Sequence, residues 1–299
     1  MKVALARGKD RQDSVTKALE LIKAEISESI QKAAQKKSKE IEDLAVLVKP
    51  NFVSPSHPLS ITSVEAVRAT LDFIKEFFPQ QILVAEGSGE CRETMPVFER
   101  YGYLALEAEF NVKLFDLNAD DYQVLQVYDE HQKLDIDVKY AKTCLAADYI
   151  ISVSPPKTHE ETVVTLSWKN IVQGCPVWQG EVNEKAKLHH GAQALQRSLA
   201  KVGKRLHPDL AVLDGWEAME GQGPALGTKV DWKIAIASTD FLAADIFCAD
   251  LMGVELDQVE YLKLGARENL GESDLSKMQI VGNIEPGKVK RKFELGDRD

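Results

Sequence analysis

Cysteine is scarce in this chain of 299 residues, with four in all: Cys91, Cys144, Cys175 and Cys248. No two of them form a Cys-x-x-Cys pair, the spacing that zinc knuckles and ferredoxin-type clusters use. We therefore expect reduced thiols and no iron–sulfur cluster within this chain.

The sequence also lacks a long apolar run and an excess of basic residues. No segment approaches the roughly 20 apolar residues that a membrane helix requires, and the apolar start of the chain becomes charged too soon for a secretory signal. The formal net charge of −10 argues against a broad nucleic-acid surface and against binding to anionic membranes. We expect a cytoplasmic protein that binds neither nucleic acid nor a membrane.

The common catalytic motifs are missing as well. There is no G-x-S-x-G elbow, phosphate-binding Walker loop, H-E-x-x-H helix or protein-kinase motif. The stretch EGSGE at 86–90 does not have the G-x-G-x-x-G spacing of a dinucleotide fingerprint. No cysteine lies beside a plausible base, so a covalent serine or cysteine mechanism has no support.

Short apolar runs, rich in β-branched residues, alternate with amphipathic segments along the whole chain. This pattern predicts an α/β fold, a doubly wound and mostly parallel sheet with helices on both faces. We expect one domain over 1–299, with a division into two lobes around a cleft near 145–205. The predicted strands are 1–7, 44–52, 81–87, 112–118, 147–153, 209–215, 233–238 and 278–283, with a hairpin over 122–140. The predicted helices are 13–35 (capped by Asp13 or Ser14), 63–78 (opened by Thr62 or Ser63), 96–110, 164–174, 190–206, 241–253 and 258–269.

Polar residues follow five of these strands directly, and ligands bind outside the carboxyl ends of strands in such sheets. The convergence predicts a site for a small anion, carboxylate or phosphate. His159 and Lys169 are the candidate catalytic residues, His159 as the acid/base. The candidate ligand-binding residues are Lys49, Asn51, Glu86, Gly87, Ser88, Lys157, Thr158, Asn170, Gly221 and Gly223.

Each part of this site has a simpler alternative. The turn at Lys49 to Asn51 is built from ordinary turn-forming residues, and the glycines between 221 and 227 suit a plain surface loop as well as an anion cradle. Lys169 could extend its amine to solvent from a half-exposed helix. A divalent metal is a further expectation, with imidazole and carboxylate candidates at His189, His190, Asp214, Glu220 and Asp240.

The order of the motifs resembles domain-of-unknown-function family 362. The resemblance rests on VLVKPNF, SVEAVRATLDFIKE, ILVAEGSG, ADYIISVSPPKTH, VTLSWKN, the LHH pair, DLAVLDG, AMEGQGP and ASTDFLAAD, from about Leu44 to Gly253. It implies a bacterial or archaeal-type α/β protein, often described as iron–sulfur-associated. Many relatives carry an added ferredoxin-like cysteine cluster, and this chain lacks those cysteines.

A fainter resemblance is to the nickel-pincer lactate racemase family. By order, it implies that His159 matches a proton-transferring histidine, Lys169 the lysine that holds the cofactor, and His189 or His190 the metal ligand. That family carries a second catalytic histidine in an A-T-G-T-H turn, whereas this chain reads AEGSGE at the matching place. The departure puts two-base racemisation in doubt.

Two classes of function follow from these patterns. One is an enzyme, or former enzyme, that binds a small anion with or without a divalent metal. The other is a non-catalytic partner or scaffold for an iron–sulfur or redox component, for which Trp168, Trp178 and Trp216 could supply the contact surface. A third and weaker hypothesis is flavin or nucleotide binding through the glycine loops.

Overall fold

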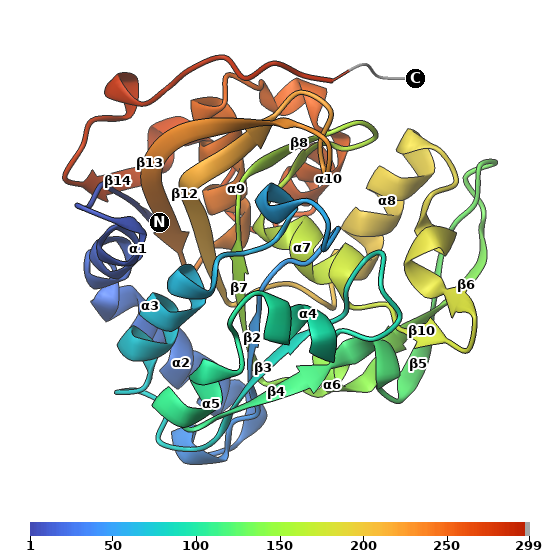
Figure 1. Cartoon of the computed structure of the whole chain (residues 1–299). Helices are drawn as coiled ribbons and strands as arrows, with labels where there is room; N and C mark the ends of the chain where they lie inside the picture. Colours follow the sequence, from blue (N-terminus) through green and yellow to red (C-terminus); the bar gives the residue numbers. More distant parts are fainter. Residues whose placement is uncertain (297–299) are drawn as a thin grey trace.

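The computed structural model describes residues 1–296, and within them one large sheet organises the chain (Figure 1). Its eight main strands lie in the order β14 (Gln279–Gly282), β1 (Lys2–Ala6), β13 (Thr228–Ser238), β12 (Leu210–Glu220), β7 (Tyr149–Ser154), β2 (Val46–Lys49), β3 (Ile82–Glu86) and β4 (Val112–Asp116). Two short strands, β8 (Lys157–His159) and β9 (Val163–Thr165), join the sheet beside β12.

The sheet is mostly parallel, as the alternation of strands and helices predicts. β12, β7, β2, β3 and β4 run in one direction, with Val48 paired to Ile151 on one side and to Val84 on the other. β13 is antiparallel to both of its neighbours, β12 and β1. Because of this reversal, the carboxyl end of β13 lies at the opposite edge of the sheet from the carboxyl ends of the parallel strands.

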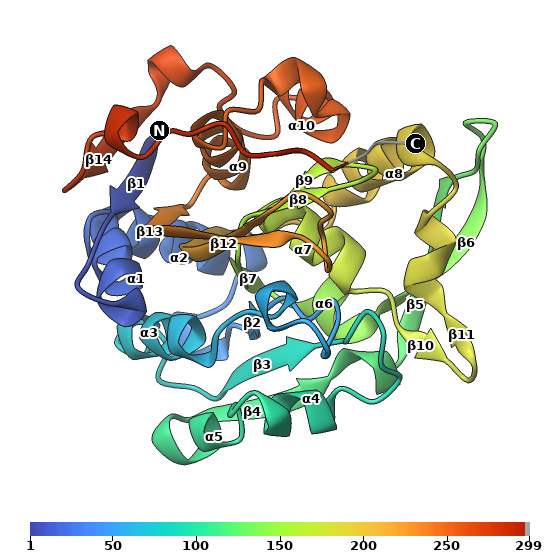
Figure 2. The same cartoon turned by 45° about the horizontal axis from the view of Figure 1, so that its top comes forward.

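Helices cover both faces of the sheet, which confirms the doubly wound architecture (Figure 2). Alternate residues of one strand enter different cores: Val3 and Leu5 of β1 belong to one hydrophobic cluster, Ala4 and Ala6 to the other. One face carries α1 (Arg11–Glu20), α2 (Lys23–Lys37), α3 (Val64–Ile74), α4 (Met95–Arg100) and α5 (Ala105–Glu109). The other carries α7 (Ser167–Gly174), α8 (Ala192–Gly203), α9 (Phe241–Leu251) and α10 (Glu260–Arg267).

Smaller elements complete the fold. Two hairpins lie outside the main sheet, β5 (Tyr122–Tyr128) with β6 (Leu134–Ala141), and β10 (Trp178–Gln179) with β11 (Val182–Asn183). A short helix, α6 (Lys142–Ala146), follows β6, and single 3₁₀ turns include η2 (Pro58–Ser60), η3 (Leu117–Ala119) and η4 (Glu184–Leu188). No helix in residues 1–296 combines the length and the apolar character needed to cross a bilayer.

Three of the predicted helices differ from the structure. The helix expected over 13–35 is two helices, because Ile22 leaves the helical region with φ −124° and ψ 23°, and the first begins at Arg11 with Asp10 as its cap. The helix expected over 96–110 is interrupted near Gly102, whose φ is +78°. The helix expected from residue 164 starts at Ser167, because Val163–Thr165 pair as β9.

Candidate functional site

A cavity of about 360 Å³ lies where β2, β3 and β7 end, as the fold class predicts for a ligand site. Its walls come from the segments that follow these strands, from α7 and η4, and from the turn between β12 and β13. The polar side chains that line it are Asn51, Glu86, Glu90, His159, Glu160, Thr165, Lys169, Asn170, Gln173, Asn183, Lys185 and His189.

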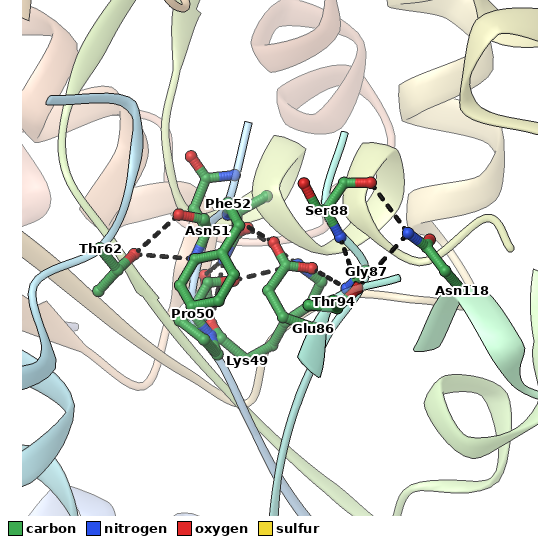
Figure 3. Close-up of polar contacts among 12 residues, drawn as sticks. Lys49, Pro50, Asn51, Phe52, Thr62, Glu86, Gly87, Ser88, Thr94 and Asn118 are labelled. Carbon is green, nitrogen blue, oxygen red and sulfur yellow. Dashed lines mark hydrogen bonds and ion pairs between the residues drawn. The ribbon is translucent and has the colours of Figure 1, made fainter. Parts of the chain in front are cut away.

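An ion pair buried at the base of the cavity joins β2 to β3 (Figure 3). The Nζ atom of Lys49 lies 3.0 Å from Oε2 of Glu86, and the two side chains are 0% and 1% exposed. The backbone N–H of Phe52 donates to Oε1 of Glu86 at 2.6 Å, and the N–H of Gly87 donates to Oε2. Burial raises the pKa of Glu86, while the ammonium of Lys49 opposes that rise. The backbone N–H groups therefore fix the orientation of the Glu86 carboxylate, and Lys49 balances its charge.

Asn170 of α7 links this ion pair to the helix above it. Its Oδ1 accepts a hydrogen bond from Nζ of Lys49 at 3.2 Å, and its Nδ2 donates to the carbonyl of Lys49 at 3.2 Å and to Oγ of Ser152 at 3.0 Å. The amide of Asn170 is thus occupied by the protein itself. Although Asn170 lines the cavity as predicted, its role is to hold α7 against β2.

A second buried lysine lies behind the segment that follows β2. Lys157, which is 0% exposed, donates to Oδ1 of Asn51 and to the carbonyl of Ser60, the latter at 3.3 Å. Burial, together with the positive charge of Lys169, lowers the pKa of Lys157 to about 7. Asn51 lines the cavity, whereas Lys157 lies outside the lining and holds the side chain of Asn51 in place by donating a hydrogen bond to it.

His159 faces the cavity as a neutral ring. Its Nδ1 accepts hydrogen bonds from the backbone N–H groups of Glu161 and Thr162, at 3.1 and 3.3 Å. An acceptor at Nδ1 requires the hydrogen of the neutral imidazole to be on Nε2. Burial, assisted by the charges of Lys169, His189 and Lys157, keeps the pKa of His159 well below its usual value. In this tautomer His159 donates a hydrogen bond from Nε2 and has no free lone pair with which to act as a base.

Two lysines on the cavity wall differ in what their amines contact. Nζ of Lys185 donates to Oδ1 of Asn118 at 2.7 Å and to the carbonyl of Pro176 at 2.5 Å. Nζ of Lys169 makes no hydrogen bond or ion pair with residues 1–296, although the side chain is only 4% exposed. Burial lowers the pKa of both amines to about 8. This burial contradicts the alternative in which Lys169 extends its amine to solvent from a half-exposed helix.

The second histidine of the cavity is held by its neighbours. Nδ1 of His189 pairs with Oε2 of Glu161, and Nε2 lies 3.1 Å from Nε2 of Gln173. Burial raises the pKa of Glu161, but the hydrogen bond and the charge of His189 outweigh this effect, so the pKa lies below its ordinary value. His189 thus lines the cavity with His159, while its neighbour His190 lies outside it, with Nδ1 3.4 Å from Oε2 of Glu130.

Five of the predicted ligand-binding residues lie just behind the wall. Oγ1 of Thr158 donates to the carbonyl of Gly221 at 2.9 Å, and Ser88 is tied to the loop before α4 through its own N–H, which donates to Oγ1 of Thr94 at 3.0 Å. The remaining three are Lys49, Lys157 and Gly223.

In the glycine loop, residues 221–227, the amides of the two predicted ligand-binding glycines are bonded within the protein. The N–H of Gly221 donates to the carbonyl of Glu294 at 2.8 Å, and the N–H of Gly223 donates to the carbonyl of Gly221 at 2.8 Å. A Cβ atom at Gly223 would lie 2.0 Å from the carbonyl oxygen of Thr158, so close packing explains this glycine. Gly87 does line the cavity, and a Cβ there would lie 2.4 Å from Oδ1 of Asn118.

The five metal candidates do not come together. Asp214 lies within β12, with Oδ2 3.1 Å from Nε of Arg11, and Glu220 pairs with Arg291 at 3.5 Å. Asp240 caps α9 at the opposite edge of the sheet, because β13 is antiparallel. No cluster of three or more His, Cys, Asp or Glu side chains in residues 1–296 is arranged to hold a metal ion.

Several cavity residues were missed from the sequence, among them Lys185, Gln173, Asn183, Glu90 and Glu160. The stretch NEKAK at 183–187 has the polarity of a surface turn, and its one local signal is Asn183, which caps η4 by accepting from the N–H of Lys185 at 3.0 Å. Of the three tryptophans considered for a partner surface, Trp168, Trp178 and Trp216, the first lies in the core, whereas the other two are half-buried. Trp168 is 0% exposed and packs against Phe241 and Tyr261 in the core.

The burial of Lys169 makes the stability of the protein depend on pH. The pKa of Lys169 is about 8 in the folded chain against an ordinary 10.5, so the unfolded chain binds the proton more tightly and stability rises with pH between these values. From about pH 7 to about pH 9.5, this group should add about 2 kcal/mol to the free energy of unfolding. Urea denaturation of wild type and of Lys169→Met across this range should show the variant with the flatter profile, and parallel profiles would contradict the assignment.

Comparisons with known proteins identify one similar sequence and one similar structure. The chain is 27% identical over 229 residues to a thylakoid-associated protein of Synechocystis sp., and the match covers 76% of this chain and 68% of that protein. In structure it is similar to the lactate racemase apoprotein from Thermoanaerobacterium thermosaccharolyticum, with a TM-score of 0.50 and 14% identity. The structural match covers 84% of this chain and 57% of that one, and it shows a shared fold, which confirms the fold-level resemblance.

The family comparison covers the whole cavity. Residues 46–250 match the family described as Domain of unknown function (DUF362). This range runs from the start of β2 nearly to the end of α9, and every residue that lines the cavity lies within it. The resemblance seen in the order of the sequence motifs is thereby confirmed, and the chain belongs to the DUF362 family.

Proposed function

We propose that this protein binds a small anion, a carboxylate or a phosphate, in the cavity at the carboxyl ends of β2, β3 and β7. The observation that carries the proposal is the amine of Lys169, which is buried, lines the cavity and has no partner within residues 1–296. Burial disfavours the ammonium form of Lys169, the charges of Glu161 and Glu160 oppose this effect only in part, and an anionic ligand would stabilise the ammonium further.

The other groups on the wall suit the same kind of ligand. The carboxylate of Glu86 is already balanced by Lys49, so Lys169 and Lys185 supply positive charge that a ligand can use. His159 offers an N–H donor at Nε2. Two further atoms of the wall, Oγ1 of Thr165 and Oε1 of Gln173, are buried without a hydrogen-bond partner in residues 1–296. A carboxylate or phosphate oxygen of a ligand would accept from Oγ1 of Thr165, and a ligand hydroxyl would donate to Oε1 of Gln173.

Thermal unfolding in the presence of phosphate, acetate, glycolate and pyruvate tests this proposal. A ligand at about 100 times its Kd stabilises the folded state by about 2.7 kcal/mol, which is a shift of several degrees for a chain of this size. We expect at least one of these anions to raise the Tm of wild type.

Three variants locate the effect. Lys169→Met and His159→Ala should lose most of the shift, whereas Lys32→Met, which removes a lysine whose side chain is 71% exposed on α2, should keep it. A shift that persists in both cavity variants would place the anion elsewhere on the protein. The absence of any shift in wild type, with every anion of the panel, would refute the proposed function.

A further inference from the structure

Of the four buried lysines around the cavity, Lys169 is set apart by its surroundings. Lys49 is paired with Glu86, Lys157 is bonded to Asn51 and Ser60, and Lys185 to Asn118 and Pro176. Nζ of Lys169 has no such contact in residues 1–296, and its side chain lines the cavity while remaining only 4% exposed. A lysine held in this way can keep its amine neutral and therefore nucleophilic.

We propose that Lys169 forms an imine with the carbonyl carbon of a small oxo-carboxylate, an aldehyde or keto acid, bound in this cavity. The inference rests on the proposed anion site and names its substrate class. It uses an amine that lines the cavity, a hydrogen-bond donor on His159 in the lining of the same cavity, and a second cation, Lys185, for the carboxylate.

The step balances without an oxidant or a reductant. The lone pair of the amine attacks the carbonyl carbon, a C–N bond forms, and the π electrons move to the carbonyl oxygen. A proton passes from nitrogen to that oxygen to give the carbinolamine. The C–O bond then breaks, and the oxygen leaves as water with the two hydrogens that the amine supplied. Nε2–H of His159 stabilises the negative charge that develops on the oxygen.

The charge state of Lys169 supports this role. Its pKa of about 8 leaves about half of the amine neutral near pH 8. An exposed lysine with an ordinary pKa has a neutral fraction on the order of a hundredfold smaller at that pH. Lys169 should therefore react before the exposed lysines.

The experiment is trapping of the imine with sodium cyanoborohydride. Wild-type protein is incubated with glyoxylate or pyruvate near pH 8, reduced, digested and mapped by mass spectrometry. We expect the reduced adduct on Lys169 to exceed that on Lys32, an exposed lysine of the same molecule, by about tenfold or more. Equal modification of the two lysines would overturn the proposal, and this comparison needs no variant to fold.

Matched variants and ligands separate this inference from the proposed function. Lys169→Arg keeps a positive charge but cannot form an imine, so it should lose the adduct at this position while retaining some of the thermal shift with glycolate. Lys169→Met should lose both. Thermal shifts with glycolate and glyoxylate but no adduct would refute imine formation and leave the anion site intact. No thermal shift with any carboxylate or phosphate would refute the anion site itself.

Discussion

Replacing Lys49 by methionine should lower the free energy of unfolding by about 3–5 kcal/mol, because Glu86 then keeps a buried carboxylate without its counter-ion. The side chains are 0% and 1% exposed, so solvent cannot compensate for the loss. Burial already raises the pKa of Glu86, and removal of the ammonium should raise it further. The defect of the variant should therefore shrink as the pH falls and Glu86 takes up a proton. Urea denaturation near pH 7 and near pH 5 measures both effects.

An exposed ion pair provides the control for this substitution. At the C-terminal end of α3, Lys75 pairs with Asp72 at 2.6 Å, with both side chains more than half exposed, and Lys75→Met should leave stability nearly unchanged. In the double variant Lys49→Met with Glu86→Gln, the uncompensated charge is absent, so its loss of stability should be less than the sum of the two single losses. If Lys49→Met costs no more than Lys75→Met, the buried ion pair is not a major contribution to stability.

The second large effect is expected at Asp245, a carboxylate that is 0% exposed on α9. It accepts hydrogen bonds from the backbone N–H and Oγ of Ser167, at 3.0 and 2.5 Å, and from the N–H of Trp168 at 3.0 Å. These donors form the first turn of α7, the helix that carries Lys169 and Asn170. Asp245→Ala would leave them buried without an acceptor and should cost about 3–5 kcal/mol.

Two other substitutions on α9 show whether the hydrogen bonds are responsible. Asp245→Asn keeps one acceptor oxygen and should recover part of the stability, while Asp250→Ala removes a partly exposed carboxylate of the same helix and should have little effect. Asp245→Ala should also weaken any anion-induced thermal shift, because the start of α7 would no longer be fixed. Equal effects of Asp245→Ala and Asp250→Ala would show that Asp245 does not anchor this helix.

Much of the cavity could be predicted from the sequence because it depends on parallel strands. Asn51, Glu86 and His159 follow three apolar runs that become β2, β3 and β7, and parallel neighbours bring their carboxyl ends to one edge. Lys169 and His189 reach the same cavity from the elements that follow β7. Local sequence was sufficient for these residues, since each lies soon after a buried strand or on a short apolar helix.

The direction of β13 accounts for the clearest misplacement. Its apolar run is the same in either direction, so the sequence pattern predicts one more parallel strand with Asp240 at the ligand edge. The structure extends β12 to Glu220 and begins β13 at Thr228, which leaves seven residues between them. A parallel crossover requires about a dozen residues or more, so this short connection requires an antiparallel pair. Lys185 cannot be found in this way, because its burial depends on tertiary contacts with the carbonyl of Pro176 and with Asn118, the latter 67 residues away in the sequence.

The short strand β8 has a consequence for how the cavity would receive a ligand. Residues Lys157–His159 pair with β9 on one side, and Lys157 pairs with Met219 of β12 on the other, so the segment after β7 belongs to the sheet. A flexible loop at this place would lose conformational entropy on each binding event, and that loss would subtract from affinity. Here the wall that carries His159 is already ordered by the fold. A hydrogen bond from this histidine to a ligand can therefore contribute to affinity without a loss of conformational entropy in the segment that carries it.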